Sequence, residues 1–389
     1  MKQKIRYGMV GGGPGAFIGA VHRHAAALDG EMELVAGAFS SHPEKSREQG
    51  GALSLDPTRV YGSYAEMAER EAALPEDERI DCVSIVTPND SHFEIARTFI
   101  EAGFHVVCDK PMTTTVEDAE ALCRLVSKHD TVFALTHNYT GYPMVKQAKE
   151  LVASGHLGKI RKIVVEYPQG WLATLLEESG NRQASWRTDP GKAGISSCMG
   201  DIGTHAHNLA EYITGLSMSE ICAELTSFVP GRELDDDGMM LVRYEGGAKG
   251  ILYASQISVG EENNLRIRIY GTDAALEWRQ EYPNDLQVKY QDKPMQLYRR
   301  GNGYLGEAAQ YYSRLPSGHP EAFIEAFANI YRAAARTIAA RKAGQKPAAL
   351  DLDFPTVQDG AAGVHFIHAA VRSSKAGGWI DAAYEAPTR

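Results

Sequence analysis

Three polar side chains of the sequence could together oxidise an alcohol: Lys110, Asp201 and His205. Oxidation of a secondary alcohol needs a base for the hydroxyl proton while a hydride leaves for a nicotinamide ring. Asp201 and His205 stand four residues apart, a spacing that places two side chains on one face of a helix. An imidazole is a suitable base near neutral pH, and the Lys110 ammonium could hold the hydroxyl or share its proton. The residues leave open which of the two accepts the proton.

Each of these residues also has a plainer interpretation. Asp201 follows a glycine and could serve only as a helix N-cap. Lys110 precedes Pro111 and could be only a solvated strand end. Asp201, His205 and His207 could seed a metal site, but no third ligand stands at a convincing spacing, so we predict no metal. The nucleotide-binding pattern earlier in the chain favours the catalytic interpretation.

A glycine-rich turn follows the first predicted strand and reads GGGPGAFIG from Gly11 to Gly19. A dinucleotide-binding fold needs glycines here for a tight turn, for approach to the pyrophosphate and for close packing of the next helix. The helix N-terminus then offers free N–H groups to the phosphates. The third glycine comes later than in the usual spacing, after a longer loop. We expect cofactor contacts from Gly11, Gly13, Pro14, Gly15, Phe17 and Ile18.

The end of the second predicted strand bears on the choice of nucleotide. An acidic residue at this place normally bonds the adenosine ribose and repels a 2′-phosphate, but here the chain has Ser40 and Ser41. Lys45 and Arg47 follow closely. Hydroxyls can also bind a bare ribose, so the choice between NAD and NADP stays open, with a slight lean toward tolerance of NADP from Ser40, Ser41 and Lys45.

Strands and helices must position these residues, and they alternate in the first third of the chain. Apolar runs predict strands at 5–10, 32–39, 80–86, 104–108 and 131–136, and helical patterns at 18–28, 92–102 and 116–129. The segment between 40 and 79 is less regular, apart from the helical SYAEMAERE. Such alternation indicates βαβ units, so we predict an α/β Rossmann domain with a parallel sheet.

The pattern changes after about residue 139. We predict helices at 143–154, 201–214, 320–344 and 359–376, and strands at 160–167, 219–227, 239–244, 249–258, 265–270, 275–279 and 286–290. Alternation from Arg266 to Tyr270 indicates a large, mostly antiparallel sheet with one wet face. The division is therefore into a dinucleotide-binding domain, 1–138, and an α+β substrate-binding and oligomerisation domain, 139–389, whose C-terminal helix can pack back on the first domain.

Three motifs, in this order along the chain, carry a family resemblance. Thr87-Pro88-Asn89 with His92 follows one strand, Asp109-Lys110-Pro111 follows the next, and GDIGTHAHN from 200 to 208 opens the first helix of the second domain. In this arrangement the chain resembles the glucose–fructose oxidoreductase, inositol dehydrogenase and rhizopine catabolism (Gfo/Idh/MocA) family over its whole length. Departures are Asp109, where the family more often has glutamate, and Ser196-Ser197, where many members have glycines.

The resemblance implies that Lys110, Asp201 and His205 form the catalytic constellation. It also implies cofactor contacts from Thr87, Pro88, Asn89, His92, Asp109, Lys110, Asn138, Trp186 and Arg187. Substrate contacts are implied for Lys110, Tyr139, Trp171, Arg187, Asp201 and His205. Trp171, Tyr312 and His319 are further candidates for the lining of a sugar pocket, because aromatic faces stack on the C–H patches of sugars.

The net charge, the apolar runs and the cysteine count restrict the classes of binding partner and the cellular location that we expect. The formal net charge of -10 argues against nucleic acid and membrane surfaces, and no apolar run is long enough to span a bilayer. The five cysteines are odd in number and lack CxxC spacing, so we predict reduced, buried thiols in a cytoplasmic protein. The resemblance implies a homodimer or homotetramer formed through the open face of the second sheet.

The sequence therefore predicts an NAD(P)-dependent oxidoreductase acting on a secondary alcohol of a sugar, cyclitol or (anhydro)glycoside. One alternative is a glycoside-cleaving enzyme that uses tightly bound NAD for transient oxidation. Another is a non-catalytic dinucleotide sensor, which would need only the Rossmann half. The sugar, the carbon oxidised and the physiological direction are not specified by the residues.

Overall fold

The computed structural model describes residues 4–388, and its amino-terminal part is a five-stranded parallel sheet in the order β2-β1-β3-β4-β5. The strands are β1 (Ile5–Gly11), β2 (Met32–Ala38), β3 (Cys82–Val86), β4 (His105–Cys108) and β5 (Phe133–Leu135). Five helices connect them: α1 (Phe17–Leu28), α2 (Pro43–Ala52), α3 (Tyr64–Ala72), α4 (His92–Glu101) and α5 (Val116–Lys128). The predicted α/β Rossmann class is confirmed.

One helix of this part lies where the sequence predicted an irregular segment. α2 is built from PEKSREQGGA, which has no apolar stripe and contains two glycines. Pro43 at its first turn supplies the local start signal, because its fixed φ suits the first helical position and its missing N–H costs nothing there. The hydrophobic pattern alone could not reveal this helix.

The second part is a nine-stranded sheet in the order β13-β12-β11-β10-β6-β9-β8-β7-β14. Its strands are β6 (Lys162–Pro168), β7 (Met218–Thr226), β8 (Asp237–Tyr244), β9 (Lys249–Ser255), β10 (Arg266–Tyr270), β11 (Ala275–Arg279), β12 (Asp285–Lys289), β13 (Gln296–Arg299) and β14 (Ile380–Asp381). Only β6 and β9 pair in parallel; the other pairs are antiparallel. The predicted α+β arrangement is confirmed, although β13 and β14 were not expected.

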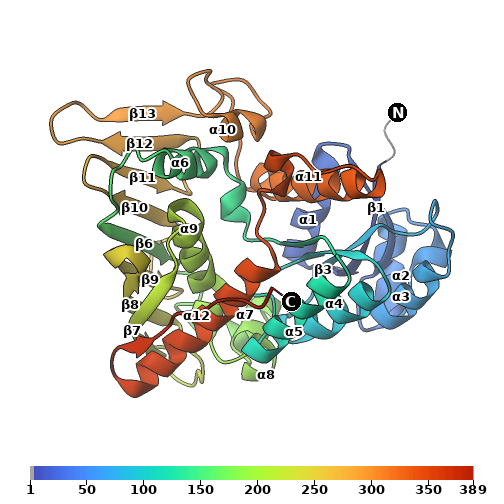
Figure 1. The fold of residues 1–389 in the computed structure, drawn as a ribbon. Coiled ribbons are helices and arrows are strands. Elements are labelled where there is room, and N and C mark those ends of the chain that lie inside the picture. Colours follow the sequence, from blue (N-terminus) through green and yellow to red (C-terminus); the bar gives the residue numbers. More distant parts are fainter. Residues whose placement is uncertain (1–3, 389) are drawn as a thin grey trace.

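Helices α6 (Pro143–Ala153), α9 (Thr204–Thr214) and α12 (Val357–Ala376) lie between the nine-stranded sheet and the first domain (Figure 1). Ile267 and Ile269 of β10 are fully buried on this face, while Arg268 between them is partly exposed on the other. Three short helices, α7 (Arg182–Arg187), α8 (Pro190–Ala193) and α10 (Glu307–Tyr311), complete the second part. One face of the sheet is therefore covered, and no helix formed by residues 4–388 covers the other.

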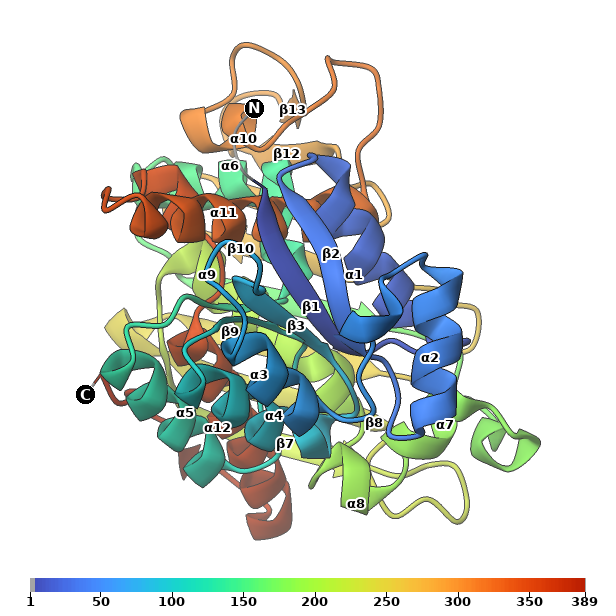
Figure 2. The ribbon, with the colours of Figure 1, turned by 90° about the vertical axis from the view of Figure 1, so that its right-hand side faces the viewer.

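The two long C-terminal helices contribute side chains to the apolar cores of the first domain, and their ribbons are drawn beside that domain in Figure 2. α11 (Phe323–Lys342) packs against α1 and β1, where its Tyr331 hydroxyl lies 2.7 Å from both His22 Nδ1 and Ser84 Oγ. α12 packs against α5 and β5 on the opposite face, and contributes Val357, Ala361 and Val364 to the apolar cluster there. The nucleotide-binding half thus depends on side chains from the far end of the chain.

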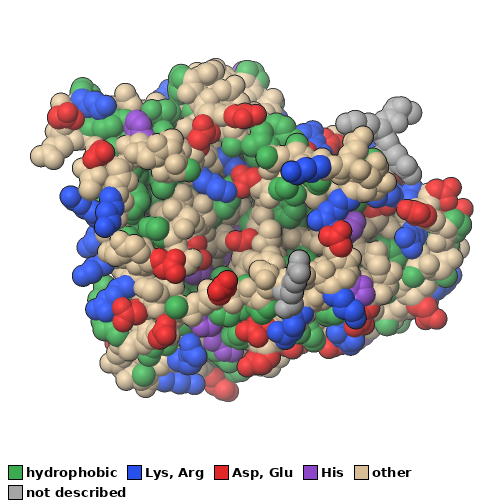
Figure 3. All heavy atoms as spheres, in the orientation of Figure 1, with side chains coloured by type: hydrophobic (Ala, Val, Ile, Leu, Met, Phe, Trp, Pro, Cys, Tyr) green, Lys and Arg blue, Asp and Glu red, His purple; other side chains and the backbone are tan. Residues whose placement is uncertain are grey.

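Acidic and basic side chains lie next to one another over most of the face shown in Figure 3, as on an ordinary solvated surface. Within residues 4–388, no helix is both long enough and apolar enough to cross a membrane.

Candidate active site

A cleft of about 750 Å³ opens at the carboxyl ends of β1 to β4. Its floor is the glycine turn and the loops after β2, β3 and β4, and its cover is the segment 182–192 of the second part. Arg182 Nη1 donates to the carbonyl of Pro14 at 3.1 Å, and Asn89 Nδ2 donates to that of Ala193 at 3.2 Å. These two contacts tie the covering segment to the loops of the first sheet.

The glycine turn has the shape needed to hold a pyrophosphate. A Cβ atom on Gly13 would lie 2.7 Å from the carbonyl oxygen of Phe39, and one on Gly19 would lie 2.4 Å from Gly12 Cα. Neither distance permits a side chain, so the turn lies directly on the second strand and on α1. Ala16 at the N-cap of α1 makes no side-chain bond to the helix, which leaves the first N–H groups available to an anion. The residues fit a dinucleotide.

Most of the residues predicted to contact the cofactor line this cleft: Gly11, Gly13, Pro14, Gly15, Ile18, Ser40, Ser41, Lys45, Thr87, Pro88, Asn89, Asp109, Lys110, Trp186 and Arg187. Their lining the cleft agrees with the prediction, and their contact with a nucleotide stays a proposal.

Three predicted cofactor residues do not line the cleft. The Phe17 side chain is 65% exposed, so only its backbone N–H at the start of α1 can serve a phosphate. His92 is fully buried, with Nδ1 2.8 Å from the Pro111 carbonyl and Nε2 2.9 Å from that of Thr87. It therefore holds two lining loops rather than the cofactor. Asn138 is buried in the turn after β5, and its Nδ2 has no hydrogen-bond partner among residues 4–388.

Asp201 is the centre of a charged cluster that joins the two parts of the molecule. Lys110 Nζ lies 2.6 Å from Asp201 Oδ1 and donates a second bond to the Asp201 carbonyl at 2.5 Å. Arg187 Nε lies 3.0 Å from Oδ2, at an angle unsuited to a hydrogen bond, and Gln256 Nε2 donates to Oδ2 at 2.8 Å. Lys110 and Asp201 thus contact each other, as predicted. Gln256, which was not predicted, also belongs to this charged cluster.

The neighbouring cations keep Asp201 ionised. Burial alone would raise the pKa of this carboxyl, but the charges of Arg187 and Lys110 and the hydrogen bond from Lys110 lower it far below its usual range. A fixed carboxylate at this place holds the Lys110 ammonium in one position, because both partners are largely removed from water. The cluster therefore presents a fixed ammonium at the edge of the cleft.

His205 lies beside this cluster in a shell of aromatic rings. Its ring is 4.8 Å from that of Tyr139 and 5.2 Å from that of His137, both edge-on. Only 6% of the residue is exposed. Burial first, and then the positive charge of Lys110, lower the pKa of His205 well below its usual value. The imidazole is therefore neutral and able to accept a proton near neutral pH.

A hydrogen-bonded chain of polar side chains forms the wall behind His205. The Tyr139 and Tyr167 hydroxyls bond each other, and Tyr167 donates to Asn263 Oδ1 at 2.7 Å. Gln169 Nε2 donates to the same oxygen at 2.7 Å, and Trp171 Nε1 donates to Gln169 Oε1 at 3.0 Å. Burial raises the pKa of Tyr139 to about 12, so the phenol stays protonated. Gln169, Trp171 and Asn263 are the partly exposed members of this chain, whereas Tyr139 and Tyr167 are buried.

The segment before Asp201 is held by a buried carboxylate rather than by glycines. Asp235 accepts hydrogen bonds from Ser196 Oγ and Met199 N at 3.0 Å and from Ser197 N at 3.1 Å. Asp201 then lies in a π-helical turn, Met199–Gly203, that precedes α9. Its carboxylate bonds side chains from other elements and caps neither helical segment, so the N-cap interpretation is wrong.

Two of the candidates for the sugar pocket, Tyr312 and His319, lie away from Asp201 and His205. Tyr312 is buried, and its hydroxyl bonds the carbonyl of Leu350. His319 is exposed, with Nδ1 3.4 Å from the carbonyl of Ser317. Both are therefore wrong as pocket residues. Sequence reasoning missed His137, Tyr167, Gln256 and Asn263; of these only His137 lay in a segment that drew attention, THNYTGYP.

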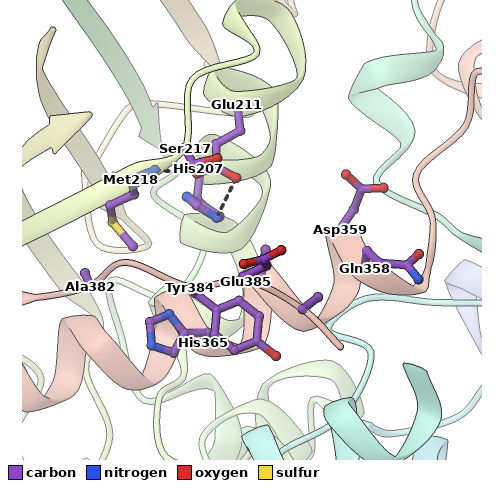
Figure 4. A pocket seen from close by; sticks show the side chains of 12 residues that line it. His207, Glu211, Ser217, Met218, Gln358, Asp359, His365, Ala382, Tyr384 and Glu385 are labelled. Atoms are coloured by element: carbon purple, nitrogen blue, oxygen red, sulfur yellow. Dashed lines mark hydrogen bonds and ion pairs between the residues drawn. The ribbon is translucent and has the colours of Figure 1, made fainter. Parts of the chain in front are cut away.

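A second pocket, of about 300 Å³, lies between α9, α12 and the C-terminal tail (Figure 4). His207 and Glu211 of α9 line it, with Nε2 3.6 Å from Oε2, and so do Asp359 and His365 of α12. At about 100° per residue, His207 points to the side of α9 opposite His205. Lys110, Asp201 and His205 do not line this pocket, whereas Lys110 lines the larger cleft. Among residues 4–388, no three His, Cys, Asp or Glu side chains cluster as metal ligands.

Comparison with known proteins matches both parts of the chain. The description "Oxidoreductase family, NAD-binding Rossmann fold" matches residues 5–137, and "GFO/IDH/MocA C-terminal domain" matches residues 145–277. An uncharacterized oxidoreductase of Bacillus subtilis, YfiI, is 34% identical over 98% of both chains. The levoglucosan dehydrogenase of Pseudarthrobacter phenanthrenivorans is 29% identical over 79% of this chain and 82% of its own.

Solved structures agree. An inositol dehydrogenase homolog from Azotobacter vinelandii, complexed with NAD+, superposes with a TM-score of 0.93 at 38% identity, covering 98% of each chain. Its complex with NADH and myo-inositol gives a TM-score of 0.90 at 37% identity over 98% of each chain.

Proposed function

This chain belongs to the GFO/IDH/MocA family and is an NAD(P)-dependent dehydrogenase acting on a CH–OH group, and on that premise we propose that it oxidises a secondary alcohol carbon of a sugar, cyclitol or anhydroglycoside. The observation that supports it best is the Lys110–Asp201 pair beside the neutral His205, at the edge of a cleft whose glycine turn fits a dinucleotide. The inositol and levoglucosan enzymes among its relatives point to the same substrate class.

The side chains divide the work of proton transfer. The Lys110 ammonium, fixed by Asp201, donates a hydrogen bond to the substrate oxygen and orients it. His205 accepts the hydroxyl proton, because its imidazole is neutral while Lys110 Nζ is engaged with two oxygens of Asp201. The glycine turn and the loops after β2, β3 and β4 would hold the dinucleotide, whose nicotinamide, when bound, would supply the hydride acceptor. The partly exposed Gln169, Trp171 and Asn263 are the residues that would bond the remaining hydroxyls.

A substrate screen tests this function. Purified protein is mixed with NAD or NADP and with myo-inositol, an anhydrosugar, an aldose, a glycoside or a simple secondary alcohol, and the absorbance of reduced nicotinamide is followed. We expect turnover with one or more polyhydroxylated ring compounds and none with the simple alcohol. A glycoside cleaved without added nucleotide would favour a transient-oxidation enzyme, and silence with every compound would contradict the proposal.

The nucleotide preference rests on the loop after β2, for which we propose tolerance of both nucleotides. Ser40, Ser41 and Lys45 line the cleft there, and none of the three carries a negative charge that would repel a 2′-phosphate. Changing Ser40 to Asp places a carboxylate where that phosphate would lie, so NADP affinity should fall at least about tenfold while NAD affinity changes little. Calorimetric titration with each nucleotide measures both constants, with Ser40→Asn as the uncharged control. Equal losses for NAD and NADP would refute this placement.

The uncovered face of the second sheet is proposed to bind a second copy of the chain. Leu241 of β8 and Ile251 of β9 are opposite each other and exposed, and Met239 lies two residues along from Leu241. A cross-strand apolar row of this kind is the usual core of a homo-oligomer interface. Leu241→Glu should reduce the sedimenting mass to that of a monomer, whereas Glu33→Gln on the exposed part of β2 should not. A monomeric unmodified protein would refute the proposal.

We propose a cytoplasmic location as well. The five cysteines are free in the described part of the chain, four of them buried, as expected where thiols stay reduced. Fractionation of cells with an antibody to the chain would test it, and recovery outside the cytoplasm would contradict it.

A further inference from the structure

A second imidazole contacts the proposed base. His137 follows β5 in the chain and is only 1% exposed. Its Nδ1 lies 3.3 Å from Nδ1 of His205, with the two rings nearly perpendicular. No other hydrogen bond to the His205 ring is formed within residues 4–388. Among the described residues, this contact is what distinguishes Nδ1 of the His205 ring from Nε2.

The contact has two possible proton arrangements, and they differ in chemistry. A neutral imidazole carries one N–H and one lone pair. If His137 donates, His205 must accept at Nδ1, so its own proton lies on Nε2 and no lone pair is left for the substrate. If His205 donates from Nδ1, its Nε2 lone pair is open. Only the second arrangement lets His205 act as a base.

We propose that His137 is a positioning residue that accepts the Nδ1–H of His205 and so keeps the Nε2 lone pair of His205 available to the substrate hydroxyl. This role rests on the proposed dehydrogenase function. In the oxidation, the O–H bond breaks and Nε2 of His205 gains the proton, the C–H bond breaks and its electron pair leaves with the hydrogen as a hydride that the oxidised nicotinamide would accept, and the Nδ1–H bond to His137 persists. No proton passes to His137, which stabilises the cationic ring as an acceptor and fixes its orientation.

The surroundings of His137 favour the acceptor role. Burial, and then the charges of Lys110 and His207, lower the pKa of His137 to about 3, so its ring keeps a lone pair. Gly363 lies near the Nε2 atom of His137. A Cβ atom built on Gly363 would be 3.7 Å from Nε2 of His137 and 2.9 Å from Oγ1 of Thr204. The Thr204 hydroxyl has no partner among residues 4–388. Thr204 Oγ1 and His137 Nε2 thus lie on the same side of Gly363 without bonding each other, and the Thr204 hydroxyl is free to accept an Nε2–H after a small side-chain rotation, which suits the tautomer with a free Nδ1.

Two substitutions of His137 distinguish its role as a hydrogen-bond acceptor from the role of its side-chain volume in packing. The side-chain amide of His137→Asn places an oxygen near the position of Nδ1, while His137→Leu has a similar volume and no acceptor. We expect His137→Leu to lower kcat about a hundredfold with KM and nucleotide affinity within about threefold, and His137→Asn to retain kcat within about fivefold. Equal kcat values for the two variants would overturn the proposal, and thermal unfolding of both establishes that the fold is kept.

Nitrogen NMR of histidine-labelled protein tests the same idea without any substrate. The His205 resonances, assigned by their loss in His205→Asn, should show a protonated Nδ1 and an unprotonated Nε2 in the unmodified protein and in His137→Asn. In His137→Leu the tautomers should mix. A protonated Nε2 in the unmodified protein would overturn the proposal, even if both variants failed to fold. Failure of the substrate screen would refute the dehydrogenase proposal and leave this tautomer measurement intact.

Discussion

Replacing Lys110 with methionine is expected to lower kcat by about three orders of magnitude while NAD(P) still binds. Methionine keeps most of the volume of the side chain but removes the ammonium that Asp201 fixes at 2.6 Å. The substrate oxygen then loses its donor, and Asp201 keeps only Arg187 and Gln256 as partners. Steady-state kinetics with the substrate found in the screen, together with calorimetric titration of the nucleotide, measure the two quantities separately.

Lys128→Met is the matched control, because Lys128 is exposed at the end of α5 and lies outside the cleft. Its kcat should stay within about twofold of the unmodified protein. Equal losses of turnover and nucleotide affinity in Lys110→Met would mean that the substitution damages the fold or the cofactor cleft. A turnover close to that of the control would remove Lys110 from the chemistry.

Replacing His205 with asparagine is expected to lower kcat by about 10² to 10³ and to change the pH dependence of kcat/KM. An imidazole base must be unprotonated, so the rate falls as pH drops through the pKa of His205. Burial and the neighbouring charges lower that pKa well below its usual value. The unmodified enzyme should therefore show no loss of rate attributable to His205 between neutral pH and about pH 6, with its decline at lower pH.

In His205→Asn the acidic decline should disappear, since no group is left to protonate at that place. His129→Asn, at the exposed end of α5, should leave both the rate and the profile unchanged. An unaltered acidic decline in His205→Asn would assign it to another group, and an unaltered kcat would exclude His205 as the base.

Strong local patterns made most of the fold predictable. The strand Ala275–Arg279 has the predicted bounds, and α1 and α4 differ from their predicted ranges by one residue. These elements carry regular apolar spacing or cap signals that are local in the chain. By contrast, β13 pairs at the edge of the sheet and all four of its residues are at least partly exposed, so it has no hydrophobic signature. Short edge strands and polar helices such as α2 are specified by their neighbours in space.

The site residues that could be predicted are those whose residue type suits the chemistry and which stand in a turn directly after a strand. Lys110 after β4 and the glycines after β1 lie at strand ends, where parallel sheets gather functional residues. Gln256 and Asn263 come from loops around β9 and β10, and reach Asp201 and Tyr167 only because the second sheet brings them there. His137 immediately precedes the candidates Asn138 and Tyr139 in the chain, but its contact with His205 spans 68 positions. Contacts of that range follow from tertiary packing and from no local pattern.

The packing of α11 and α12 on the first sheet also has a consequence for synthesis. A ribosome delivers β1 to β5 long before the helix that ends at Ala376, yet Phe327, Tyr331 and Val364 belong to the cores of that sheet. The cores of the first sheet therefore cannot be completed, and its apolar faces stay uncovered, until the last helix has been translated. We expect this protein to mature after release rather than domain by domain, and a stalled chain to bind chaperones.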